Sequence, residues 1–114
     1  MHIDSYQFGK IVIDGKTYNS DCLILSGSVQ PNWRRKQGHL LDVEDLQPVI
    51  ASQPSILVVG TGASGMMKVS ENLADFLLEH GIELFTDNTH KAVAKFNELA
   101  EKGENVAGAM HLTC

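Results

Sequence analysis

One stretch near the middle of the chain constrains the fold more than any other. Four aliphatic residues, Ile56-Leu57-Val58-Val59, run directly into the turn Gly60-Thr61-Gly62-Ala63-Ser64-Gly65. A short apolar run bounded by turn residues is typical of a buried strand in a parallel sheet. Helical and strand patterns alternate after it, which predicts β-α-β-α-β over residues 56–112. We therefore expect parallel strands with helices packed on the faces of the sheet.

The residues ahead of this stretch are β-rich. Asp14-Gly15 is the strongest hairpin-turn pattern in the chain. The N-terminal strands are expected to extend the sheet or to form a small β-layer over one end. The prediction is a single compact three-layer α/β domain with a mixed sheet and N-terminal β-hairpins. Its β-rich part covers residues 1–41 and its α/β part covers residues 42–114.

Three helices are expected in the second part. The first lies within 42–53 and begins near Asp45, close to a run of acidic residues that suits a helix N-terminus. Ser70 is predicted to cap the second helix and Thr89 the third, which should run to about residue 102. The last strand covers 106–112, where small residues leave room for close packing.

The glycine turn has the spacing of the Gly-x-Gly-x-x-Gly motif of dinucleotide-binding folds. In those folds the pyrophosphate binds at the N-terminus of a helix that follows at once. Here the helix is expected only from Ser70, and the α/β unit is small, so we predict no cofactor. A small-ligand, nucleotide or anion site, with or without enzymatic activity, is the alternative. Its residues would be Gly60, Thr61, Gly62, Ser64 and Gly65, with Arg34 as the anion partner.

A basic and aromatic cluster lies at residues 33–36, with the only Trp and three of the nine Lys and Arg residues. Such a cluster can form a binding surface through charge and cation–π contacts. The competing interpretation is a strand edge whose Trp covers the core and whose charges prevent pairing with other chains. The predicted interaction surface comprises Trp33, Arg34, Arg35, Met66 and Met67.

His111 and Cys114 form a second candidate cluster at the end of the chain. They could supply two metal ligands or a thiolate beside an imidazole, with His39 or Cys22 near them in the fold. The simpler interpretation is a free thiol in a fraying terminus. Because no complete ligand or catalytic set is evident, we predict no metal site and no catalytic residue.

Composition excludes several classes of function. The net charge of −5 argues against a nucleic-acid partner, which needs a basic face. No apolar run approaches the roughly 18 residues of a membrane span, so no membrane insertion is expected. The start has no signal-peptide pattern, and we expect a cytoplasmic protein with both thiols free.

Groups of residues spread over essentially the whole chain occur in an order that resembles a known family: Trp33-Arg34 before Gly38-His39, Gly60-x-Gly62, His80-Gly81-Ile82 with Thr89, Ala92-Val93 and Asn97, and His111-x-Thr113-Cys114. It is the small domain family of unknown function that includes the adipogenesis-associated domain protein and, distantly, a mitochondrial complex I assembly factor. The resemblance implies a three-layer α/β domain without established catalysis. It also implies another protein as partner, and so a non-enzymatic interaction or assembly-type role.

Overall fold

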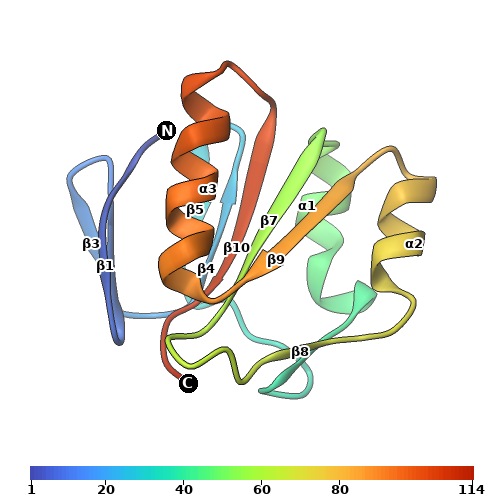
Figure 1. Ribbon diagram of the computed structural model, residues 1–114, viewed down its shortest axis with the longest axis horizontal. Helices are drawn as coiled ribbons and strands as arrows, with labels where there is room; N and C mark the ends of the chain where they lie inside the picture. The colour runs from blue at the N-terminus through green and yellow to red at the C-terminus, as the bar shows by residue number, and fades with distance from the viewer.

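A five-stranded mixed sheet forms the centre of the molecule in a computed structural model that describes residues 1–114 (Figure 1). Its strand order is β5-β4-β10-β7-β9. The middle strand is β10, and β7 lies next to it, second from one edge. Strand β7 pairs in parallel with β10 and β9, whereas β4 pairs antiparallel with β10 and with β5. The five strands are β4 (Cys22–Leu25), β5 (Ser28–Gln30), β7 (Ile56–Thr61), β9 (Glu83–Asp87) and β10 (Val106–His111). The predicted mixed sheet is confirmed.

The first three strands form a separate antiparallel sheet in the order β1-β2-β3. They are β1 (Ile3–Gln7), β2 (Lys10–Ile13) and β3 (Lys16–Tyr18). Asp14 and Gly15 both have positive φ, as expected for a two-residue hairpin turn. The N-terminal segment thus does both things predicted for it, because β4 and β5 extend the main sheet and β1–β3 form a β-layer. A third, two-stranded sheet consists of β6 (Leu40–Leu41) and β8 (Lys68–Val69), which pair in parallel over two residues each.

Helices lie on both faces of the main sheet (Figure 1). Helix α3 (Thr89–Glu101) covers one face together with the β1–β3 sheet, and α1 (Gln47–Ser52) and α2 (Leu73–Glu79) lie on the other side. A 3₁₀ helix, η1 (Val43–Leu46), leads into α1. None of the helices is both long and apolar enough to cross a bilayer.

Two hydrophobic clusters hold the three layers together, one on each face of the sheet. Successive side chains of β7 point to opposite faces, so Leu57 and Val59 join one cluster while Val58 joins the other. The first cluster includes Leu46, Val49, Leu73 and Leu77 from the α1 and α2 side. The second includes Phe96 and Leu99 of α3 and Ile3, Ile11 and Ile13 of the N-terminal sheet. The strand is buried on both faces, as its apolar run predicts.

The predicted helix starts are wrong in each case by one to three residues. Helix α2 begins at Leu73, and Ser70 contributes only its carbonyl, which accepts from the Leu73 N–H at 3.1 Å. Helix α3 is capped by Asn88, whose side chain accepts from the Lys91 N–H at 3.0 Å.

The first helix also departs from the expected start at Asp45, since the 3₁₀ helix η1 begins at Val43 and α1 begins at Gln47. Asp42 caps η1, since its side chain accepts from the Val43 N–H and the Asp45 side chain accepts from the Asp42 N–H in return. Pro48 then falls in the first turn of α1, where its missing N–H is tolerated.

Candidate functional site

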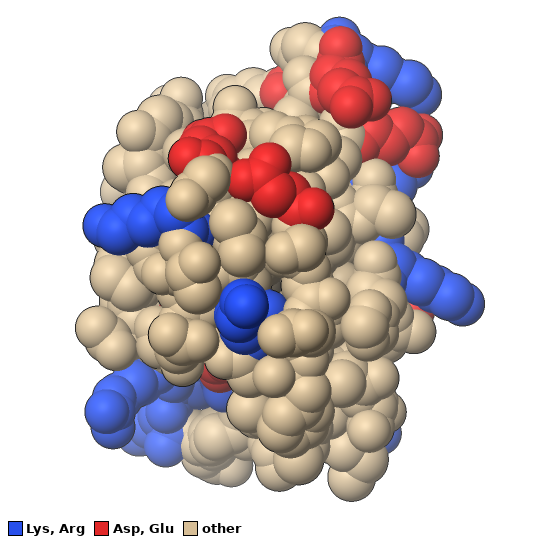
Figure 2. Space-filling view, turned by 90° about the vertical axis from the view of Figure 1, so that its left-hand side faces the viewer, with Lys and Arg blue, Asp and Glu red and all other residues tan.

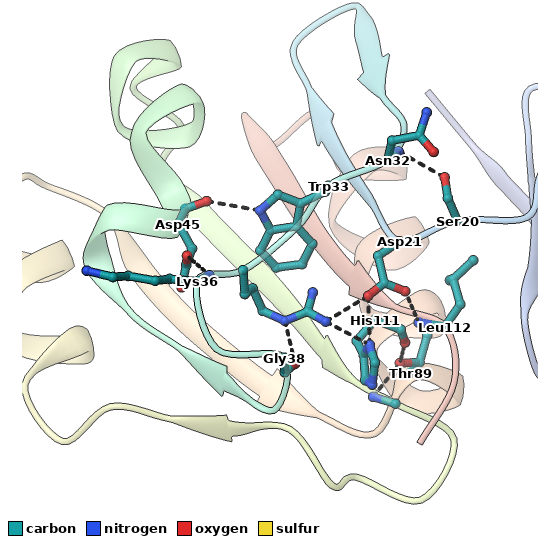
Figure 3. A network of polar contacts seen from close by, with 12 residues as sticks. Ser20, Asp21, Asn32, Trp33, Lys36, Gly38, Asp45, Thr89, His111 and Leu112 are labelled. Atoms are coloured by element: carbon teal, nitrogen blue, oxygen red, sulfur yellow. Dashed lines mark hydrogen bonds and ion pairs between the residues drawn. The ribbon is translucent and has the colours of Figure 1, made fainter.

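The carboxyl ends of β7, β9 and β10 meet at one edge of the sheet, which we call the carboxyl edge. Ligands of α/β folds commonly bind at such an edge. Four segments gather there: the glycine turn after β7, the N-terminus of α3, residues 111–114 after β10, and the 31–39 segment (Figures 1 and 3). The Lys68 N–H donates to the His39 carbonyl at 2.7 Å, which joins the 31–39 segment to the residues after the glycine turn.

The glycine turn is shaped by close neighbours. Gly60 lies within β7 rather than in the turn, and a Cβ placed on it would be 2.7 Å from Thr89 Oγ1. Gly62 has φ +107°, and a Cβ there would overlap the Cys114 carbonyl carbon and lie 2.9 Å from His111 Cδ2. Contacts below 3 Å exclude any side chain at these positions. Packing against α3 and the end of the chain therefore accounts for both glycines.

The backbone N–H groups of this turn already donate hydrogen bonds to protein atoms. Thr89 Oγ1 accepts from the Gly62 N–H at 2.8 Å. The Thr113 carbonyl accepts from the Ala63 N–H at 2.7 Å, and the Cys114 carbonyl accepts from the Met66 N–H at 2.8 Å. In dinucleotide-binding folds such groups face the phosphates. A phosphate can reach them here only if residues 113–114 move away.

The remaining predicted ligand-binding residues lie at the same edge but surround no cavity. Thr61 is buried, and its hydroxyl donates to the Asp87 carbonyl at 3.1 Å, whereas Ser64 is exposed. The chain continues from the turn into β8, not into a helix. The two surface cavities lie elsewhere; one of about 350 Å³ is lined by Leu25, Phe96 and Val106, and the other lies beside α2.

Thr89 ties three parts of the carboxyl edge together. This residue is fully buried at the first position of α3. Its hydroxyl donates to the His111 carbonyl at 2.6 Å while accepting from the Gly62 N–H. The side chain therefore joins the start of α3 to β10 and to the glycine turn, instead of capping the helix as the sequence suggests.

Asp21, Arg35 and His111 form a buried polar cluster beside the glycine turn (Figure 3). Asp21 Oδ2 lies 2.8 Å from Arg35 Nη2 and 2.8 Å from His111 Nδ1, and Oδ1 accepts from the Leu112 N–H at 2.8 Å. The side chains of Arg35 and His111 are each only 5% exposed. Arg35 also donates from Nε to the Gly38 carbonyl and lies over the Trp33 ring at 4.7 Å.

The cluster determines which nitrogen of His111 carries the proton. An ionised carboxylate only accepts, so the 2.8 Å contact with Asp21 Oδ2 requires a proton on Nδ1. Arg35 Nη2 is also a donor, and its 3.2 Å contact with Nδ1 is then not a hydrogen bond. In the neutral ring Nε2 is left as an acceptor. This Nε2 atom is buried and has no hydrogen-bond partner, and the same is true of Arg35 Nη1.

Asp21 is held in its charged form. Burial alone would raise the pKa of this carboxyl. Hydrogen bonds from His111, the Leu112 N–H and Arg35 outweigh burial, and the pKa of Asp21 lies below its usual value. The cluster is thus an ionised carboxylate that accepts hydrogen bonds from two side chains, Arg35 and His111. No group of three or more His, Cys, Asp or Glu side chains is arranged to hold a metal ion.

The two cysteines are free and lie in opposite environments. Cys22 is buried at the start of β4, and burial raises the pKa of its thiol to about 12. Cys114 is exposed at the carboxyl edge beside Gly62. The ring of His111 and the backbone of Cys114 both lie next to Gly62, while a chemical role for the pair stays a prediction.

Part of the predicted interaction surface is buried. Trp33 is 9% exposed, packs in the first cluster and donates from Nε1 to the Asp45 carbonyl at 3.0 Å. Met67 is 2% exposed in the same cluster. The prediction that these two side chains offer a surface is wrong, because both fill the core, and Arg35 is held by Asp21. Arg34 and Met66 are exposed, as predicted.

An exposed aromatic residue absent from the sequence-based set lies at the same edge. Phe8 is 62% exposed at the tip of the β1–β2 hairpin. The adjacent Gly9 N–H donates to the Leu112 carbonyl at 2.9 Å. The Met66 N–H donates to the Cys114 carbonyl, so the backbone next to Phe8 and that of Met66 both contact residues 112–114. No local pattern around Phe8 indicates this contact.

Known proteins share this fold over the full chain. A conserved hypothetical protein from Pyrococcus horikoshii is 28% identical, with 100% of each chain covered and a TM-score of 0.87. A protein described as an outer membrane protein from Bartonella henselae is 23% identical over 98% of this chain and 94% of its own, with a TM-score of 0.82. A Bordetella pertussis protein described as a Mth938-like domain is 17% identical over 97% and 85%, with a TM-score of 0.62. The last two likenesses concern the fold alone.

The family comparison covers nearly the whole chain. Residues 3–111 match the family described as a protein of unknown function, DUF498/DUF598. The expected membership of a small α/β family of unknown function is confirmed, while the link to the adipogenesis-associated protein and the complex I assembly factor stays a prediction. The chain belongs to the DUF498/DUF598 family.

Proposed function

We propose that this protein is a non-enzymatic interaction domain of the assembly type that binds another protein at its carboxyl edge. The docking surface consists of Phe8 and Met66 as apolar anchors with Arg34 and Lys68 beside them. The observation that carries the proposal is the pair of exposed anchors, 62% and 52% exposed, on segments that both bond to the backbone of residues 112–114. Large exposed apolar side chains near a polar rim are typical of interaction sites.

Charge indicates the chemistry of the partner. The two segments 31–41 and 62–70 contain four Lys and Arg residues and no Asp or Glu, so the rest of the chain has five Lys and Arg against all 14 acidic residues. Figure 2 shows one group of Lys and Arg side chains at the lower left, others spread over this face, and acidic side chains mainly in the upper half. Arg35 and Lys36 are paired with Asp21 and Glu44, but Arg34 and Lys68 form no ion pair. A partner with an apolar segment flanked by Asp or Glu complements this surface.

The filled glycine turn supports docking over the alternative of a small-ligand or nucleotide site. Its N–H groups are satisfied by the protein itself, and no cavity lies beside Gly62. A ligand present at 100 times its Kd would add about 2.7 kcal/mol of stability. We expect no thermal shift with nucleotides, phosphate or small acids, and a clear shift with any of them would favour the alternative. A cytoplasmic setting, where thiols stay reduced, is part of the proposal.

A quantitative pull-down with matched variants tests the docking surface. The wild-type chain, Phe8→Ala with Met66→Ala, Arg34→Glu and Leu78→Ala serve as baits in extracts of the producing organism. Leu78 is a matched control, since it is 65% exposed but lies on α2. We expect a captured protein that is lost with the double variant, retained with Leu78→Ala, weakened by Arg34→Glu and weakened by salt. Capture that is equal for all four baits would refute the surface.

A further inference from the structure

The free nitrogen of His111 is the strongest unexplained feature of the carboxyl edge. The His111 side chain is 5% exposed, Asp21 holds its Nδ1, and Nε2 is buried without a partner. Buried polar atoms usually have a hydrogen-bond partner, and an exception at a charged cluster commonly marks a functional group. A carboxylate that orients an imidazole with its other nitrogen free is the arrangement that general-base histidines use.

The backbone of Cys114 lies close to the His111 ring, next to Gly62. A Cβ at Gly62 would touch both the Cys114 carbonyl carbon and His111 Cδ2, the ring atom bonded to Nε2. The ring atom next to Nε2 therefore lies near both Gly62 and the backbone of Cys114. Hydrogen bonds from Ala63 and Met66 to the carbonyls of Thr113 and Cys114 hold that backbone in place. The Cys114 residue itself is exposed, so its thiol is accessible to solvent.

We propose that Cys114 is a reactive thiol, with His111 as its base and Asp21 as the positioning residue. The proposed mechanism requires rotation about the Cα–Cβ bond of Cys114 to place Sγ next to Nε2, because Nε2 has no hydrogen-bond partner in the structure. Catalytic hydrogen bonds often form only on this kind of adjustment. The co-reactant is a small disulfide, because a thiolate beside an imidazole attacks disulfides readily near neutral pH. This inference does not depend on the docking role.

The exchange step balances without any further reagent. His111 Nε2 takes the proton of the Cys114 thiol, and the thiolate attacks one sulfur of the disulfide. The Sγ–S bond forms as the S–S bond of the reagent breaks, and its second half leaves as a thiolate. That thiolate receives the proton from Nε2, so the products are a mixed disulfide at Cys114 and one free thiol. Asp21 stays ionised throughout and stabilises the imidazolium.

The rate of mixed-disulfide formation with oxidised glutathione, followed by intact-protein mass spectrometry from pH 5.5 to 9, tests the proposal. One modification is expected, absent in Cys114→Ser and unchanged in Cys22→Ala, because the buried Cys22 thiol stays protonated. We expect Asp21→Asn to slow the reaction about tenfold at pH 6.5, equivalent to a shift of one unit in the pH profile. Equal rates and profiles for wild type and a folded Asp21→Asn protein would overturn the proposal.

A second comparison avoids any variant that fails to fold. The peptide Met110-His111-Leu112-Thr113-Cys114 has the same His and Cys but lacks Asp21 and the surrounding fold. Cys114 in the folded protein should react about tenfold faster than this peptide at pH 6.5, and at a similar rate above pH 9, where free thiols are largely ionised. A folded protein that reacts no faster than the peptide at pH 6.5 would show that Cys114 is an ordinary thiol.

Discussion

Asp21 Oδ2 lies 2.8 Å from His111 Nδ1, although the two residues are 90 positions apart in the chain. Asp21 directly precedes β4 and His111 ends β10, and the pairing of these strands places Cys22 opposite Met110. The contact therefore joins the β-rich N-terminal part to the end of the α/β part. Arg35 adds the 31–39 segment to the same carboxylate.

Replacing Asp21 by Asn should strongly destabilise the fold. The change removes the charge that Arg35 and His111 share in a site that is largely buried. Breaking a buried pair on one side leaves the other charge uncompensated and costs about 3–5 kcal/mol. Urea denaturation at pH 7 measures the effect. Asp75→Asn, on the exposed side of α2, should change stability by less than about 0.5 kcal/mol. Equal small changes for both variants would contradict the role of the cluster.

The stability contributed by Asp21 should depend on pH in the acid range. Burial raises the pKa of this carboxyl, but its hydrogen bonds with His111, Leu112 and Arg35 lower the pKa further, so the folded value lies below the unfolded one. The contribution is then fully present above the usual Asp pKa of about 3.9 and is lost as the pH falls through the folded value. Free energies of unfolding for wild type and Asp21→Asn should converge below about pH 4. Curves that stay parallel far into the acid range would argue against this linkage.

Gly62→Ala should be far more harmful than Gly81→Ala. Both glycines have positive φ, where an L-residue costs roughly 1–2 kcal/mol. A Cβ at Gly81 meets nothing within 4 Å, whereas one at Gly62 would overlap the Cys114 backbone. Overpacking adds about 1–3 kcal/mol. The difference between the two variants in urea denaturation isolates the packing against residues 111–114, and a difference near zero would mean that these residues are not held against the turn.

Thr89→Val tests the buried hydroxyl at the start of α3. The substitution keeps the shape but leaves the Gly62 N–H and the His111 carbonyl without partners. Each unpaired buried group costs about 1–3 kcal/mol, so we expect a loss of roughly 2–4 kcal/mol in thermal or urea unfolding. Thr86→Val, at an exposed position of β9, is the matched control and should be close to neutral. A neutral Thr89→Val would show that solvent replaces these bonds.

Trp33→Ala should act through stability rather than through a partner. The indole is buried in the first cluster and bonded to Asp45, and loss of a buried Trp costs about 3–5 kcal/mol. Arg34→Ala, at the exposed neighbouring position, should leave the free energy of unfolding within about 0.5 kcal/mol. Calorimetry of the two variants separates these roles. If the Trp33→Ala protein had wild-type stability, a role of Trp33 in binding a partner would again be the better interpretation.

The secondary structure was predictable where local patterns and burial agree. The apolar run of β7 and the Asp14-Gly15 turn both appear as expected, because each pattern depends on neighbouring residues alone. The caps of α2 and α3 were misassigned. Ser70 and Thr89 have the residue type of a cap, but tertiary partners take their side chains: Asp42 at 3.2 Å for Ser70, and Gly62 and His111 for Thr89.

The candidate site was predictable only in part. The sequence drew attention to the glycine turn by its spacing and to Arg34 and Met66 by their type, and both of these side chains are exposed. Asp21 was missed because nothing next to it in sequence indicates a partner 90 residues away. Phe8 was missed because its exposure depends on how the hairpin meets β10.

The sequence by itself determined the class of fold, since period-two and helical patterns specify which faces of each segment must be buried. It did not indicate that β10, and not β7, is the middle strand of the sheet, because strand order depends on the packing of the whole chain. Only the tertiary structure decided that residues 113–114 fill the glycine turn and that Asp21, Arg35 and His111 share one buried cluster. The physical reason is that these contacts depend on strand order and register, which arise from the packing of the whole chain and not from any local segment.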